Sequence, residues 1–206
     1  VSTDEHGIDL LELELELKQG EPEVLFQVAQ QLAEQCPVLM SDISKAERGY
    51  GLLAKSARYA GIKKDWAGKI PTFDEQQDVI GCFKSYFAFQ LSSLQRSLEY
   101  GIWDGQKNQN EKTGLQIQLL KNLLSLFTHI DCLPDAQLLK RQLDQASQSP
   151  LELTRLWGQL SLACGHWLFN LSNDSAAFTL SEDEILSMRL HIEQLSNALL
   201  AKGIRS

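Results

Sequence analysis

Basic side chains gather in one part of this sequence, between positions 45 and 69. Seven lysine or arginine residues lie there, opposed only by Glu47 and Asp65, in a chain whose formal net charge is −8. Two aromatic residues, Tyr59 and Trp66, lie among them. A basic face with interleaved aromatic rings suits an anionic partner, either nucleic acid or an acidic protein surface. The predicted binding residues are Lys45, Arg48, Lys55, Arg58, Tyr59, Lys63, Lys64 and Trp66.

The basic segment can also arise without any partner. The first 23 residues carry eight acidic side chains against Lys18 alone, so they can lie along the basic face and neutralise it within the fold. In addition, any helix that buries an apolar stripe usually exposes charged residues on its opposite face, so a basic face does not require a partner. We therefore expect a solvated or internally paired face first, a protein partner next, and nucleic acid or a small anion after that.

Histidine and cysteine side chains form a second pattern. His129 and Cys132 are three residues apart, and Cys164 and His166 are two apart, which together supply the ligands of a two-histidine, two-cysteine zinc site. Residues two apart on a helix point to different faces. The Cys164–His166 pair is therefore badly placed for one ion, and we expect packed side chains with no metal and no cofactor.

Recognisable catalytic motifs are missing from the sequence. It has no G-x-x-x-x-G-K-[ST] phosphate loop, no G-x-G-x-x-G, no G-x-S-x-G elbow and no E-x-x-H pair. Glu184 and His191 fall on one helix face, where a solvated pair is expected rather than an acid–base dyad. Helical bundles can hold pockets without any sequence motif, so a site involving His129, His166 or Tyr86 stays open.

Composition indicates a globular chain with a buried core. Of its 206 residues, 43% are hydrophobic, and this length fits a single domain, 1–206, with a possible subdivision at a polar connector over 101–112. The four cysteines are far apart, which favours reduced thiols over a disulfide framework. No apolar run approaches the roughly 18 residues that span a bilayer, and the acidic N-terminus is unlike a signal peptide, so we expect a cytoplasmic protein.

The longest predicted element runs from Pro71 to Gly101. Thr72 and Glu75 have the spacing of an N-terminal capping box, and Gly101 stands where a glycine often ends a helix. A helix with two apolar stripes needs neighbours on two sides, so residues 73–100 should lie at the centre of a bundle. One stripe is Ile80, Phe83, Phe87, Leu91, Leu94 and Leu98; the other is Val79, Cys82, Tyr86 and Phe89.

Helical periodicity continues on both sides of this element. The capping boxes Ser149/Glu152 and Ser181/Glu184 mark two further helix starts. Within the segment from Ile8 to Lys18, leucine and glutamate alternate from Leu11 to Leu17 as in a strand. Both are helix formers and no second strand is predicted, so we expect a helix. The fold class is therefore all-α, a single bundle of about seven or eight helices. The remaining helices are expected over about 22–35, 37–60, 113–130, 133–146, 149–171 and 181–202.

These observations favour a non-enzymatic helical module that binds another protein through a surface face, as an adaptor, an assembly or secretion accessory, or an inhibitor does. The first alternative is a nucleic-acid-binding protein that uses the basic 45–69 segment. The second is an enzyme or ligand carrier with a pocket between helices.

Overall fold

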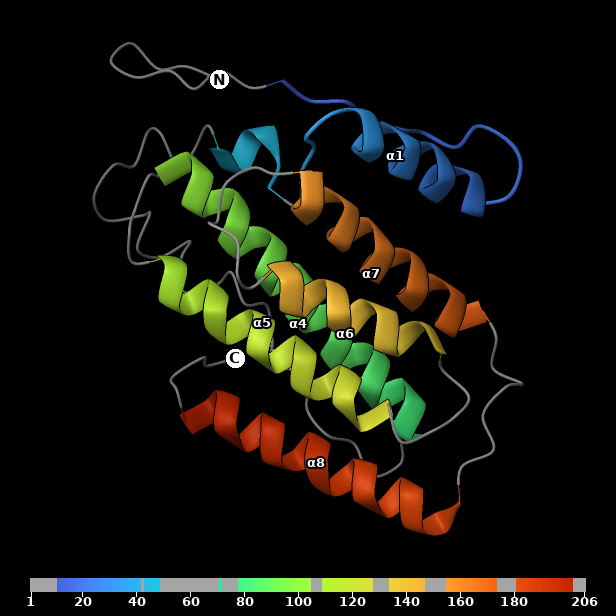
Figure 1. Cartoon of the computed structure of the whole chain (residues 1–206), viewed down its shortest axis with the longest axis vertical. Helices are drawn as coiled ribbons and strands as arrows, with labels where there is room; N and C mark the ends of the chain where they lie inside the picture. The colour runs from blue at the N-terminus through green and yellow to red at the C-terminus, as the bar shows by residue number, and fades with distance from the viewer. Residues whose placement is uncertain are drawn as a thin grey trace.

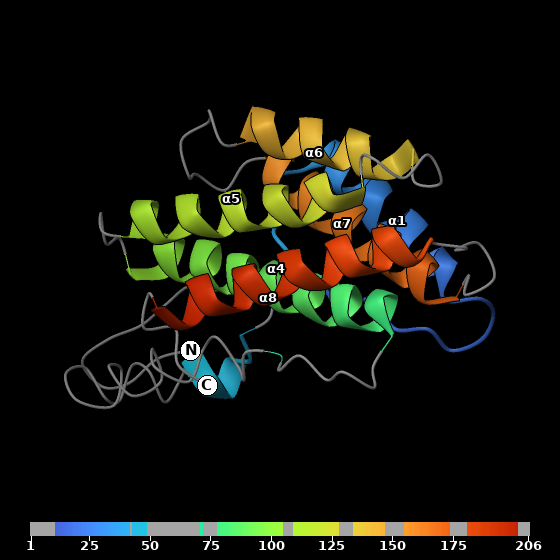
Figure 2. The same ribbon diagram turned by 90° about the horizontal axis from the view of Figure 1, so that it is seen from below.

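The chain folds into a bundle of α-helices, and no strand occurs in the part of it that the structure describes. This computed structural model describes residues 11–41, 43–48, 71, 78–104, 109–127, 134–146, 155–173 and 181–201. The predicted all-α fold is confirmed (Figures 1 and 2). The helices are α1 (Glu23–Gln35), α4 (Val79–Asp104), α5 (Gln109–Phe127), α6 (Pro134–Ala146), α7 (Arg155–Asn173) and α8 (Glu182–Ala201).

Helix α4 lies at the centre of this bundle, as its two apolar stripes predict. It contacts α5, α7 and α8, and Figure 2 shows α8 crossing in front of it. Phe83 and Phe87 present their side chains to the edge of Trp167 in α7, with ring centroids 5.7 and 5.0 Å apart. Such edge-on pairs stabilise a core by about 0.5–1.5 kcal/mol beyond the area that they bury.

The second face of α4 is buried as well, although half of it is polar. Burial raises the pKa of the Tyr86 phenol, against a smaller opposing effect of the Ser196 side chain of α8. Because neighbouring elements cover this face as well, α4 is packed on two sides. Phe89, which was predicted to belong to this stripe, is only partly buried. The buried residues of the face are Val79, Cys82, Tyr86, Gln90, Ser93 and Ser97.

Both ends of α4 differ from the prediction. The helix begins at Val79, where the Asp78 carboxylate accepts a hydrogen bond of 2.7 Å from the backbone N–H of Gly81. Thr72 and Glu75 lie outside the described residues. Gly101 does not end the helix, because one glycine in a helix costs only about 1 kcal/mol and packing outweighs it. The predicted connector over 101–112 is consequently helical at 101–104 and again from 109 onward.

Helix α8 starts as the sequence predicts, with a reciprocal capping box. The Ser181 hydroxyl accepts a hydrogen bond of 3.3 Å from the Glu184 N–H, and the Glu184 carboxylate accepts one of 2.8 Å from the Ser181 N–H. The backbone N–H of Ser181, followed by its hydroxyl, lowers the pKa of Glu184. The equivalent box at Ser149 and Glu152 lies outside the described residues.

Helix α1 packs on α7 through aromatic side chains. Phe26 stacks on the imidazole of His166, with centroids 4.8 Å apart and planes inclined by 14°, and it also contacts Phe169. Gln159 of α7 donates a hydrogen bond of 3.3 Å to the carbonyl oxygen of Ala33. These contacts fasten the N-terminal part of the chain to the bundle, at the side of α7 away from α8 (Figure 1).

The predictions of a helix over residues 8–18 and of another over residues 37–60 are wrong for part of the described chain. Residues 11–17 are extended rather than helical, and the chain then turns into α1 at Gly20, whose φ of 106° favours glycine. Residues 37–41, 43 and 44 are also non-helical; helix begins only at Lys45, where the Ser44 hydroxyl accepts a bond of 3.1 Å from the Glu47 N–H. The rest of the predicted 37–60 helix, from position 49, lies outside the described residues.

The cysteines that the structure describes are thiols and not disulfides. Cys36 is exposed, whereas Cys82 and Cys164 are buried. Burial raises the pKa of the Cys164 thiol to about 12, so this side chain acts as a small apolar group of the core. Among the described ranges, no helix combines the length and the hydropathy that crossing a membrane requires.

At Gly158, helix α7 lies very close to the backbone of Val38 in the N-terminal segment. A Cβ at this position would lie 1.9 Å from the carbonyl oxygen of Val38, whereas a Cβ at Gly114 of α5 would meet nothing within 4 Å. Alanine is usually more stable than glycine in a helix by about 0.5–1 kcal/mol. Alanine substitution at these two helical glycines therefore compares a crowded position with an open one.

We expect Gly158→Ala to lower the free energy of unfolding by about 1–3 kcal/mol, because backbone must move to admit the methyl group. Gly114→Ala should raise it by about 0.5–1 kcal/mol. Urea unfolding followed by circular dichroism measures both. Equal effects of the two substitutions would contradict the close approach of Val38 to α7.

Candidate functional site

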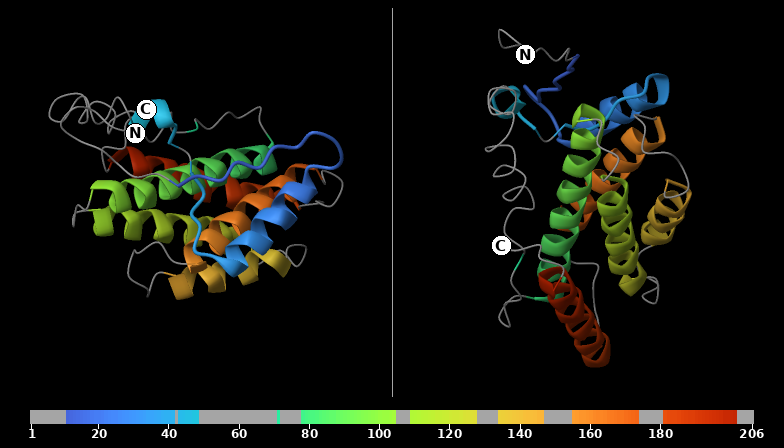
Figure 3. Two further views of the ribbon diagram at one scale, coloured as in Figure 1. Left: turned by 90° about the horizontal axis from the view of Figure 1, so that it is seen from above. Right: turned by 90° about the vertical axis from the view of Figure 1, so that its left-hand side faces the viewer.

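An extended segment with an unusual orientation lies at the N-terminal edge of the described chain. We call residues 11–17, which alternate leucine and glutamate, the N-terminal strap (dark blue in Figure 3). Leu11 is fully exposed, and Leu13 and Leu15 keep 66% and 40% of their surface exposed. Only towards its end does the strap approach α1, where Leu15 and Leu17 border a shallow depression together with Val24 of that helix.

The glutamates of the strap point the other way, to Lys45. The ammonium of Lys45 lies 2.9 Å from the Glu12 carboxylate and 3.0 Å from that of Glu14. The hydrogen bonds with these two carboxylates raise the pKa of Lys45. Glu12 is therefore largely covered, whereas Glu14 and Glu16 keep 79% and 73% of their side chains exposed, so the strap presents both leucine and glutamate to solvent. For Lys45, this pairing is the internal neutralisation that the acidic N-terminus makes possible.

Arg48, the second residue of the predicted basic face, is buried. Its guanidinium pairs with Glu99 of α4, and only 7% and 6% of the two side chains is exposed. The Ser41 hydroxyl joins the pair, donating to Glu99 over 2.6 Å and accepting from Arg48 over 2.9 Å. Nearby, Glu47 pairs with Arg96 of α4 at 2.7 Å. Arg48 thus fastens the 41–48 segment to the bundle and does not belong to a solvated face.

The remaining predicted binding residues are not described, so their role stays a prediction. They are Lys55, Arg58, Tyr59, Lys63, Lys64 and Trp66. His129 and Cys132, one half of the imagined zinc site, also lie outside the described residues. In the described half, Cys164 is fully buried and His166 stacks on Phe26. Within the described ranges, no three metal-ligating side chains come together.

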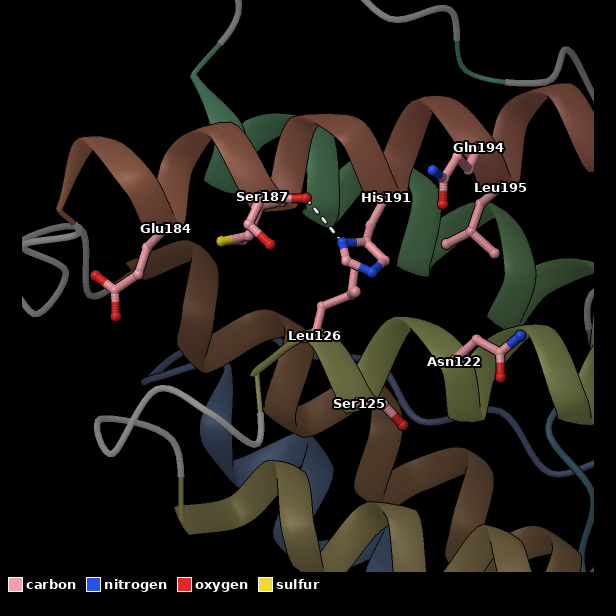
Figure 4. A pocket seen from close by; sticks show the side chains of 9 residues that line it. Asn122, Ser125, Leu126, Glu184, Ser187, His191, Gln194 and Leu195 are labelled. Carbon is pink, nitrogen blue, oxygen red and sulfur yellow. Dashed lines mark hydrogen bonds between the residues drawn. The ribbon is translucent and has the colours of Figure 1, made fainter.

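A groove between α5 and α8 is a second candidate site (Figure 4). Its volume is about 490 Å³, within the range of small-molecule sites. Figure 4 shows the His191 ring between the two helices, with a hydrogen bond of 2.8 Å from its Nδ1 to the carbonyl oxygen of Ser187. The lining residues are Asn122, Ser125, Leu126, Glu184, Ser187, Met188, His191, Gln194 and Leu195.

The chemistry of this groove follows from the tautomer of His191. A carbonyl oxygen only accepts, so Nδ1 carries the proton and a neutral ring keeps a lone pair on Nε2. Glu184 is bound to Ser181 at the start of the helix, so it and His191 each make their hydrogen bond within α8. The groove also holds the amides of Asn122 and Gln194, which can donate and accept, beside the apolar side chains of Leu126, Met188 and Leu195, so it suits a small ligand with both polar and apolar parts.

Sequence reasoning found only part of either site. The spacing of Glu184, Ser187, His191 and Gln194 places them on one face of α8, which periodicity reveals. Their pairing with α5 depends on tertiary packing, which periodicity does not reveal. The alternation of leucine and glutamate in the strap was recognised in the sequence, but the segment was predicted to be a helix.

Comparison with known proteins adds no family to these observations. No family model matches the chain, and neither a curated protein nor a solved structure matches it. The function has to be judged on the geometry of the strap and of the groove.

The Arg48–Glu99 pair generates a stability prediction. Glu99→Gln leaves the buried guanidinium without its counter-charge, and we expect unfolding free energy to fall by about 3–5 kcal/mol. Replacing both partners together, as Arg48→Met with Glu99→Leu, should be less harmful than Glu99→Gln alone, because no unpaired charge remains. Chemical denaturation of the three proteins gives the comparison.

The control for this experiment is Glu16→Gln in the strap. Glu16 pairs with Lys18, but both side chains are more than 70% exposed, so solvent screens their attraction and stability should hardly change. If Glu99→Gln were as mild as Glu16→Gln, the buried pair would not hold the 41–48 segment to the bundle.

Proposed function

We propose that this chain is a protein-binding module and that the leucine face of the N-terminal strap is its contact surface. The observation that carries the proposal is the orientation of the strap. Three leucines at alternate positions face solvent, while the glutamates between them are held by Lys45. The leucines are Leu11, Leu13 and Leu15.

Solvent exposure of these leucines is energetically unfavourable unless something covers them. Burying one leucine side chain stabilises a complex by roughly 1.5–3 kcal/mol. A contiguous apolar patch on a protein surface is a common mark of an interaction site. Three leucines in a row along one side of an extended backbone form such a patch, narrow and about 14 Å long at 3.4 Å per residue.

The anchoring of the strap supports the proposal further. Lys45 holds it from one side, and the turn at Gly20 connects it directly to α1. A segment that is already extended and held in place loses less conformational freedom on binding than a disordered one. The leucine face is therefore presented in a partly preorganised form.

The two alternatives have weaker support. In the described part of the basic segment, Arg48 is buried with Glu99 and Lys45 is already paired with two glutamates, with which a phosphate would have to compete. The α5–α8 groove supports a ligand carrier, but the hydrogen bond of its His191 runs along α8 rather than across the groove. The strap is the more specific feature because three leucines at alternate positions stay exposed while Lys45 holds the glutamates between them.

A binding experiment with matched variants tests the proposal. The strap variant replaces Leu11, Leu13 and Leu15 by serine; the control replaces Leu186 and Leu190, two exposed leucines of α8. A photo-reactive residue at Gln19, next to the strap, is crosslinked in extracts of the source cell. We expect one stoichiometric protein adduct with the parent chain and with the control, and its loss with the strap variant.

Thermal unfolding of all three proteins provides the check on folding. Leucines that are already exposed contribute little to the core, so the midpoints should agree closely. An adduct that survives in the strap variant, or no stoichiometric adduct with the parent chain, would overturn the proposal.

A further inference from the structure

The backbone of the strap is extended, and no strand lies beside it in the part of the chain that the structure describes (Figure 3). Residues 11–17 are extended, and within the described chain their backbone N–H and C=O groups make no hydrogen bond to another backbone group. Only side chains fasten the strap, through Glu12 and Glu14. A row of extended, unpaired backbone groups is the template on which another strand can add.

We infer that the strap binds as an added β-strand along the open edge of a β-sheet in a partner protein, an edge whose residues alternate apolar with lysine or arginine. This inference rests on the proposed function and specifies the kind of partner. In strand addition, main-chain hydrogen bonds provide affinity and alternate side chains provide specificity. The strap has both elements, over a length of seven residues that is usual for a strand.

The alternation of the strap determines what the partner edge must present. Residues directly opposite each other in paired strands lie on the same face of the sheet. Apolar partner residues therefore have to face Leu11, Leu13 and Leu15, on the solvent side of the strap. Basic residues have to face the glutamates; 79% of the Glu14 side chain and 73% of the Glu16 side chain are exposed and able to accept a second cation.

The charge pattern of the strap also makes a second copy of this chain a poor binding partner for it. An antiparallel pairing that places leucine opposite leucine also places glutamate opposite glutamate: Glu14 then faces Glu12 or Glu14 of the second copy, depending on the register. Like charges directly opposite each other destabilise a sheet. Moving the register by one residue puts leucine opposite glutamate and loses the apolar contact as well. The charge pattern thus points to a basic edge rather than to a dimer.

A synthetic strand of the stated chemistry serves as the probe. It is the fluorescently labelled peptide Lys-Val-Lys-Val-Lys-Val-Lys, with blocked ends; its control has the same residues in two blocks, three valines and then four lysines. Fluorescence anisotropy with the whole chain should show binding of the alternating peptide and much weaker binding of the block peptide. Serine at Leu11, Leu13 and Leu15 should weaken it by about tenfold or more.

Two methylated probes decide whether the backbone takes part. In a strand, successive N–H groups point to opposite edges, so only every second residue bonds to a given neighbour. One peptide is N-methylated at its valines and the other at its three C-terminal lysines. Strand addition predicts that one of the two loses binding while the other keeps it.

The outcomes separate this inference from the proposed function. Equal effects of both methylations, or equal binding of the alternating and block peptides, would overturn strand addition. Sedimentation at neutral pH tests the alternative that the strap pairs with a second copy of this chain. A dimer that forms with the parent chain and not with the serine variant would overturn the inference that a basic sheet edge binds the strap. The crosslinked adduct in cell extract would stand in either case, since it depends on the leucines and not on backbone pairing.

Discussion

The buried ion pair between Arg48 and Glu99 determines how the N-terminal part of this chain meets the bundle. Charges removed from water need excellent geometry, and here the Ser41 hydroxyl satisfies both partners at once. Because Glu99 belongs to the central helix α4, the pair places the 41–48 segment at a defined point on the bundle. The helical turn that begins at Lys45 is positioned as a consequence.

The position of Lys45 in turn decides which way the strap faces. Its ammonium attracts Glu12 and Glu14, and in an extended chain these two side chains point to the same side. The leucines between them then have to point away. A buried interaction in the bundle is thus connected, through one exposed lysine, to the apolar surface that we propose as the contact with another protein.

The sequence predicted the elements whose burial pattern repeats regularly. The two stripes of α4 and the capping box of α8 were recognised because each depends on residues within a few positions of one another. Gly101 was misjudged because the packing of α4 outweighs the small preference against glycine. The strap was misjudged for a different reason: its contacts with Lys45 join residues about 30 positions apart, which no local pattern reveals. The candidate sites were harder to predict than the helices. Arg48 and Lys55 are both basic residues in the same segment of the sequence, and only the contact with Glu99 shows that Arg48 is buried.

The glutamates of the strap have two roles that depend on each other. An extended, exposed segment of leucines is an aggregation hazard, and charged residues between them are the usual protection. Here the same charges anchor the strap and discourage pairing with an identical strap, because glutamate would meet glutamate. A basic edge removes that penalty, so the charge that excludes a second copy is also what selects the partner.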